Sequence, residues 1–124
     1  MAKLIGHLFT SEAKQFTTFE VEGLKETPKQ YTKTKESEST IPQYAHRYWH
    51  IMPKNQLGQL KESYDYSSVK SFTMYDTAEN MQQFRKMVFD VLSERAATVK
   101  AKYDNILDML GAVEGSLLSD EGGL

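Results

Sequence analysis

The spacing of apolar residues divides the chain into two regions near residue 76. Before that point, short apolar runs alternate with polar residues, and the region holds all three prolines and most of the threonines, serines and tyrosines. After it, the residues are mainly Ala, Leu, Met, Val, Glu, Lys and Gln, which favour helix. The pattern predicts an α+β fold, with a small antiparallel sheet over residues 1–76, a long amphipathic helix over 77–118 and a frayed tail over 119–124.

Four to five short strands are predicted in the first region, and they are largely antiparallel because their connections are short. The polar residues 11–14 suit a hairpin, and Gly23 and Pro28 bracket a turn. Residues 29–35 alternate as in a solvated edge strand or arm, and residues 64–68 indicate a further turn. The predicted strands are residues 3–10, 16–21, 29–35, 44–52 and 69–74.

Residues 36–42 and 44–52 contrast sharply. Residues 36–40 contain no apolar side chain and a proline follows at 42, so the sequence predicts a mobile loop over 36–42. Residues 44–52 are rich in aromatic side chains, which predicts the central strand of the sheet. Strand alternation then turns Trp49 and Ile51 toward the core. It leaves a polar aromatic face made of Tyr44, His46, Tyr48 and His50.

The C-terminal helix gives the clearest local signal. Asp76 is a suitable N-cap with Glu79 three residues further on, as in a capping box, and Gly111 can form the C-terminal cap. Apolar residues along this helix follow two phases. The early set, which we expect to pack on the sheet, consists of Met81, Phe84, Val88 and Val91.

The second phase alternates spacings of three and four over about four heptads, which is typical of a coiled coil. Its members are Phe89, Leu92, Ala96, Val99, Tyr103, Ile106, Leu110, Val113 and Leu117. Leu107 and Met109 widen the stripe, which favours a contact of three or four helices. The alternative is that the helix only covers its own sheet, but nine turns measure about 50 Å against about 20 Å for a short strand. The expected partner face is Val99, Tyr103, Ile106, Leu107, Leu110 and Val113.

Composition excludes several classes of protein. The chain has 124 residues, enough for one modest domain, and its formal net charge of −2 gives no overall footprint for nucleic acid or an anionic membrane. The absence of cysteine excludes disulfide scaffolds, thiolate metal sites and cysteine nucleophiles. Neither a secretory signal nor a membrane span is visible, so the default expectation is a cytoplasmic protein that does not bind membranes.

No combination of residues predicts catalysis, a metal site or a cofactor. His46 and His50 are four residues apart, which suits a metal on a helix, but on a strand they lie about 13 Å apart. Glu20 and Glu22 share a strand face, yet such pairs are more often solvated than catalytic. No nucleophile elbow or phosphate-binding glycine loop occurs. We therefore expect a protein without enzymatic activity.

A nucleic-acid interface is the alternative to a protein interface. Aromatic side chains on a sheet can stack on bases, and lysines can neutralise phosphates. A face of that composition suits contact with a protein as well. The candidate surface consists of Tyr44, His46, Tyr48, His50, Lys33 and Lys35, with Arg47, Trp49, Lys29 and Lys54 nearby in the sequence.

Four short strings follow one another between residues 1 and 90. They are Phe19-Glu20-Val21-Glu22, Pro28-Lys29-Gln30-Tyr31, Pro53-Lys54-Asn55-Gln56-Leu57-Gly58 and Tyr75-Asp76-Thr77-Ala78. Their order resembles small accessory proteins encoded by phages and mobile elements of Gram-positive bacteria. The resemblance implies a non-enzymatic binder, such as an inhibitor of a bacterial defence system, and carries no functional residues across. Together with the helix, it predicts an interaction protein that self-associates and binds a bacterial protein.

Overall fold

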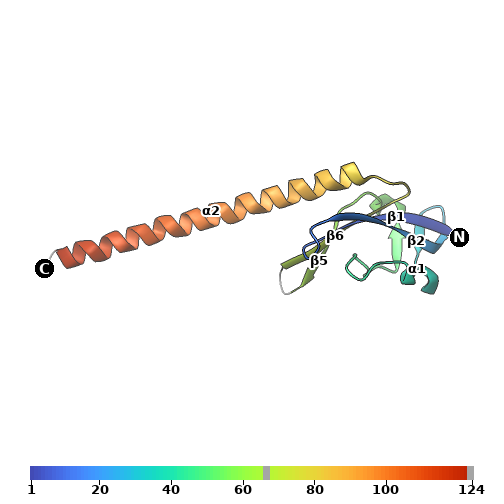
Figure 1. The fold of residues 1–124 in the computed structure, drawn as a ribbon, viewed down its shortest axis with the longest axis horizontal. Coiled ribbons are helices and arrows are strands. Elements are labelled where there is room, and N and C mark those ends of the chain that lie inside the picture. The colour runs from blue at the N-terminus through green and yellow to red at the C-terminus, as the bar shows by residue number, and fades with distance from the viewer. Residues whose placement is uncertain (66–67, 123–124) are drawn as a thin grey trace. The chain divides into compact units, whose positions relative to one another are not determined.

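The computed structural model describes residues 1–65 and 68–122 and confirms the α+β class (Figure 1). Its sheet has six strands in the order β4-β3-β2-β1-β6-β5, where four to five were expected. The strands are β1 (Ala2–Thr10), β2 (Phe16–Glu26), β3 (Gln30–Thr32), β4 (Ile51–Pro53), β5 (Lys61–Asp65) and β6 (Ser68–Asp76). The helices are α1 (Lys35–Ser39), the short 3-10 helix η1 (Lys54–Gln56) and α2 (Met81–Gly122). The chain divides into two units after Val88, and the first unit contains the whole sheet.

Strand β1 lies at the centre of the sheet, between β2 and β6 (Figure 1). The predicted hairpin over residues 11–14 joins β1 to β2, and Phe9 pairs with Phe16 across it. On the other edge, Phe9 pairs with Phe72 of β6, and both pairings are antiparallel. Strand β1 is paired along both edges, and five of its nine residues are buried.

One face of the central strands forms the main core. The Phe19 ring lies over the backbone of Gly6, and a Cβ added to Gly6 would sit 2.2 Å from its Cζ atom. The same ring meets Tyr75 edge-on, with 5.9 Å between ring centroids. Only glycine leaves room for this packing. The buried members of the core are Leu4, Leu8, Val21, Leu24, Tyr31, Ile41, Ala45, Met52 and Tyr75.

The first two turns of α2 belong to the same unit as the sheet, and Phe84 and Val88 of the early apolar set are buried there as predicted. Met81 is half-buried, and Val91 lies in the second unit. The ring of Phe84 lies 5.7 Å from His7 and 5.7 Å from Phe16, the latter edge-on. His7 also holds the start of the helix, because its Nε2 accepts a hydrogen bond from the Asn80 N–H at 2.8 Å.

The start and end predicted for this helix are wrong. Strand β6 continues to Asp76, so the helix begins at Met81 and the proposed capping box does not form. The Asp76 carboxylate accepts from the Thr77 N–H, and the Glu79 carboxylate accepts from the Met81 N–H. The helix also passes through Gly111, so the predicted cap at Gly111 is wrong. Glycine only weakens a helix interior and does not have to end it.

Residues 23–42 are more ordered than predicted. Gly23 lies inside β2 with φ of 74°, at a shift in the β1–β2 register, and forms a bulge rather than a turn. Strand β3 lies between β2 and β4, so it is not an edge strand, and its Tyr31 is buried. The predicted loop over residues 36–42 contains helix α1. Thr34 and Ser37 cap this helix through their side chains, and Ser37 is buried.

The predicted central strand over residues 44–52 is also wrong. Residues 42–50 are irregular, and only Ile51–Pro53 form a strand, at the edge of the sheet. Trp49 packs against the core as expected, but Ile51 is exposed and Met52 is buried in its place. Strand β5 was missed: Tyr64 and Asp65 belong to it and Ser68 begins β6, while residues 66–67 of the predicted turn lie outside the described residues.

Candidate functional site

Two surfaces stand out: a stripe of apolar side chains on α2 and a hollow lined by tyrosines on the sheet unit. Every residue from 96 to 118 on α2 is exposed. The six residues of the predicted partner face are therefore all exposed in the single chain, with exposed fractions from 46% at Leu107 to 66% at Val99. We define this set, Val99, Tyr103, Ile106, Leu107, Leu110 and Val113, as the stripe. Phe89, Leu92, Met109, Leu117 and Leu118 extend it.

The charges along the helix are segregated. Arg95, Lys100 and Lys102 form a basic segment, and no lysine or arginine follows Lys102 in the chain. The charged residues after it are all acidic: Asp104, Asp108, Glu114, Asp120 and Glu121. One pair within the helix joins the two segments, because the Lys100 Nζ lies 2.7 Å from the Asp104 carboxylate. Both partners of this pair are exposed, so we expect it to contribute little to stability.

The hollow has a volume of about 470 Å³ and lies beside the irregular segment 42–50. Arg47 and Lys70 contribute positive charge to its wall, and Glu38 and Asp65 contribute negative charge. Three tyrosines, Tyr44, Tyr48 and Tyr64, give it an aromatic character. Its remaining lining residues are Gln43, Ala45 and Ser63.

Lys70, Tyr44 and Tyr64 of this wall are held by contacts within the protein. The Lys70 ammonium lies 3.6 Å from the Asp65 carboxylate and 5.4 Å from the centre of the Tyr44 ring. The Tyr64 hydroxyl donates to the Glu62 carboxylate. Tyr48 remains 89% exposed, the highest value among the large hydrophobic side chains of the described residues. The hollow thus contains one very exposed tyrosine, Tyr48, beside Tyr44 and Tyr64, whose side chains contact charged neighbours.

The structure separates the residues that the sequence placed on one strand face. Tyr44 and Tyr48 both line the hollow, but His46 is half-buried with its backbone N–H bonded to Thr73 Oγ1, and His50 is exposed elsewhere. Lys33 is also drawn inward. Its ammonium donates to the Arg47 carbonyl at 2.6 Å and lies 5.3 Å from the Trp49 ring centre.

Lys35 is exposed at the start of α1 and does not line the hollow. Sequence reasoning missed Tyr64, Asp65 and Lys70 as lining residues. The alternation of residues 61–65 could have indicated a strand, but nothing local shows that this strand lies beside residues 44–48.

A hydrogen bond from Tyr75 fixes the backbone of the irregular segment at His46. The Tyr75 hydroxyl donates to the His46 carbonyl at 2.5 Å, and the Tyr75 ring meets the Trp49 ring at 5.5 Å between centroids. Burial raises the pKa of Tyr75 from 10.0 to about 12. Burial also lowers the pKa of His46 below 6.5, and the positive charges of Lys61 and Lys33 lower it further. Both side chains are therefore neutral at neutral pH.

We expect the free energy of unfolding to fall between pH 10 and pH 12 because of Tyr75. The unfolded chain releases the tyrosine proton above pH 10, whereas the folded chain keeps it until about pH 12, so rising pH favours unfolding. The loss is roughly 2 kcal/mol by pH 12. Tyr75→Phe removes this alkaline component and costs about 1 kcal/mol at pH 7 through the lost hydrogen bond. Urea denaturation of both proteins at several pH values measures the difference. An equal fall in the free energy of unfolding between pH 10 and pH 12 in the two proteins would contradict this prediction.

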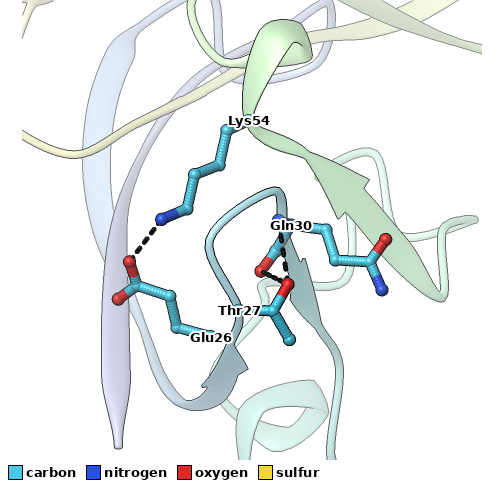
Figure 2. A network of polar contacts seen from close by, with 4 residues as sticks. All are labelled: Glu26, Thr27, Gln30 and Lys54. Atoms are coloured by element: carbon cyan, nitrogen blue, oxygen red, sulfur yellow. Dashed lines mark hydrogen bonds and ion pairs between the residues drawn. The ribbon is translucent and has the colours of Figure 1, made fainter.

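Lys54 lies beside the turn between β2 and β3 and is paired within the protein. Figure 2 shows the Lys54 ammonium directed at the Glu26 carboxylate, 2.6 Å away, beside the Thr27–Gln30 hydrogen bonds that close the turn. The hydrogen bond that the Lys54 ammonium donates to the Glu26 carboxylate raises the pKa of Lys54. Lys54 also lies 5.3 Å from the Tyr31 ring centre. Two of the lysines considered for phosphate contacts, Lys33 and Lys54, thus have partners within the protein. Lys70 of the hollow is also paired.

Metal sites and membrane-spanning helices are not found among residues 1–65 and 68–122. Among the described residues, no cluster of three or more His, Asp or Glu side chains could hold a metal ion. Within the same residues, no helix is long and apolar enough to cross a membrane. Comparison with family models, curated proteins and solved structures finds no match for this chain.

Proposed function

We propose that this chain is a non-enzymatic protein-interaction module that self-associates through the stripe on α2. The observation that carries the proposal is the stripe itself, a row of large apolar side chains kept on one side of a helix and exposed in the single chain. Scattered exposed leucines are common on protein surfaces, but a contiguous apolar row marks an interaction site. Helices without tertiary contacts are also marginal in water, so a partner would stabilise residues 96–118.

The hollow supports a second contact, with a different protein. Tyrosine and arginine are enriched at the energetic centres of protein interfaces, and Tyr44, Tyr48, Tyr64 and Arg47 line this hollow. The resemblance to phage accessory proteins favours a bacterial host protein as the partner, which this chain would modulate or inhibit. Nucleic acid is the alternative partner. It is the less favoured of the two, because Lys33, Lys54 and Lys70 already have partners within the protein.

Ile106→Asp tests the self-association. Ile106 lies in the middle of the stripe, and a charge buried there without a partner costs several kcal/mol, enough to weaken association more than a hundredfold. We expect the wild type to have a multiple of the 14.2 kDa chain mass and the variant to have the monomer mass by light scattering. Asn105→Asp adds the same charge at the neighbouring exposed position outside the stripe, and it should leave the mass unchanged.

Light scattering of both proteins at low and high salt distinguishes association through an apolar interface from association through bound nucleic acid. Association through the stripe should persist at high salt, whereas nucleic acid carried by the protein should dissociate. A wild type that is monomeric at all concentrations would overturn the proposed self-association.

A further inference from the structure

The order of charges beside the stripe distinguishes the two ways in which a second copy could pair with it. Four charged residues border the apolar seam. Arg95 and Lys102 come directly before the seam residues Ala96 and Tyr103, and Lys100 and Glu114 come directly after Val99 and Val113. In coiled coils, residues at these two bordering positions meet their counterparts on the neighbouring helix and decide its orientation.

A parallel pair would place like charges together. In parallel helices in register, a residue just before the seam meets the residue five positions later on the other chain. Arg95 would therefore meet Lys100 of the second copy, twice in each symmetric pair. Glu114 would meet Met109 and gain no charge partner. The basic segments would lie side by side, and so would the acidic ones.

An antiparallel pair brings opposite charges together. If Tyr103 packs against Ile106 of the second copy, the other seam residues also meet in apolar pairs. These pairs are Val99 with Leu110, Ala96 with Val113, and Leu92 with Leu117. Residues 95–102 then lie opposite residues 107–114, so the basic segment of each helix faces the acidic segment of the other. Lys100 comes within reach of Glu114 of the second copy.

We infer that the occupant of the stripe is the same helix of a second copy, running antiparallel, with Tyr103 and Ile106 at the centre of the contact. This inference rests on the proposed self-association and adds its orientation. Leu107 and Met109, which widen the stripe and are exposed in the single chain, then lie near the centre of the contact. Ala96, the smallest residue of the seam, lies opposite the β-branched Val113.

Single cysteines test the orientation, because the chain has no cysteine of its own. Val99→Cys and Leu110→Cys are prepared separately, one with a mass tag, and are oxidised alone and as a mixture. In the antiparallel pair, position 99 of one chain faces position 110 of the other, within the distance that a disulfide can span. Two copies of position 99 lie about 16 Å apart, which is too far for a disulfide. We expect cross-linked dimers in the mixture, all of them joining different chains, and none from either variant alone.

Each outcome bears on one claim. Cross-linking of Val99→Cys with itself, as efficient as in the mixture, would overturn the antiparallel orientation and leave self-association intact. A dimer by light scattering that cross-links in neither experiment would overturn the proposed register. A monomeric mass for both unoxidised variants and for the wild type would overturn the proposed function itself. Both substitutions are at exposed positions of the helix, so the sheet unit should fold in each variant.

Discussion

Phe84→Ala should lower the free energy of unfolding of the sheet unit by about 3–5 kcal/mol. Its ring is 0% exposed and fills the space between His7 and Phe16, with both ring centroids 5.7 Å away. Truncation removes the buried apolar surface and leaves a cavity. Rigid strands line that cavity on one side, so it cannot readily collapse. The loss is large for a domain of this size, whose total stability is of the order of 5–15 kcal/mol.

Urea denaturation in the Ile106→Asp background measures this loss without a contribution from self-association. Phe89→Ala is the matched control, since Phe89 is on the same helix, five residues further on, and is 70% exposed. We expect a change of about 0.5 kcal/mol or less for the control. A Phe84→Ala loss below about 1 kcal/mol would contradict the packing described for the start of α2.

Gly6→Ala should destabilise the protein by about 1–3 kcal/mol or more, although it adds only one methyl group. The new Cβ would lie 2.2 to 2.6 Å from three atoms of the Phe19 ring. That ring cannot easily move away, because it packs edge-on against Tyr75. The usual gain in stability from replacing a glycine by alanine is therefore reversed at this position.

Gly111→Ala provides the opposite case for comparison. Gly111 lies inside α2 with no atom within 4 Å of an added Cβ, so alanine should stabilise the helix by about 0.5–1 kcal/mol. Thermal denaturation should therefore shift in opposite directions for the two variants. Phe19→Leu should recover part of the Gly6→Ala loss, because it removes the ring that the new methyl group meets. A neutral Gly6→Ala would show that Phe19 does not pack over β1.

The parts of the fold that could be predicted are those in which local pattern and tertiary environment agree. Residues 3–10, 16–21 and 69–74 were expected as strands and lie within β1, β2 and β6. The two phases of apolar residues along the helix correspond to its buried and exposed positions. These signals are periodic over several residues, and the burial of Phe84 and the exposure of Ile106 follow from them directly.

The remaining parts depend on contacts that a local pattern does not contain. Residues 44–50 have the composition of a strand, but Tyr75 binds the His46 carbonyl and Thr73 binds the His46 N–H, so these groups do not pair with a neighbouring strand. Helix α1 is too polar to be recognised by amphipathicity, and the side chains of Thr34 and Ser37 stabilise it instead. The tyrosine hollow joins residues 44–48 to Tyr64 and Lys70, and only the sheet order brings these together.

The central position of β1 has a consequence for how the chain folds during synthesis. Its partner β6 and the covering residues Phe84 and Val88 are among the last parts of the sheet unit to leave the ribosome. Until then, the β1–β2 hairpin has one unpaired edge, and the face that holds His7 and Phe16 is not covered by Phe84. At roughly 5–20 residues per second, that interval lasts several seconds, which is long compared with hairpin formation. The newly made chain is therefore most exposed to proteases, chaperones and premature pairing with other nascent chains just before the first turns of its long helix emerge.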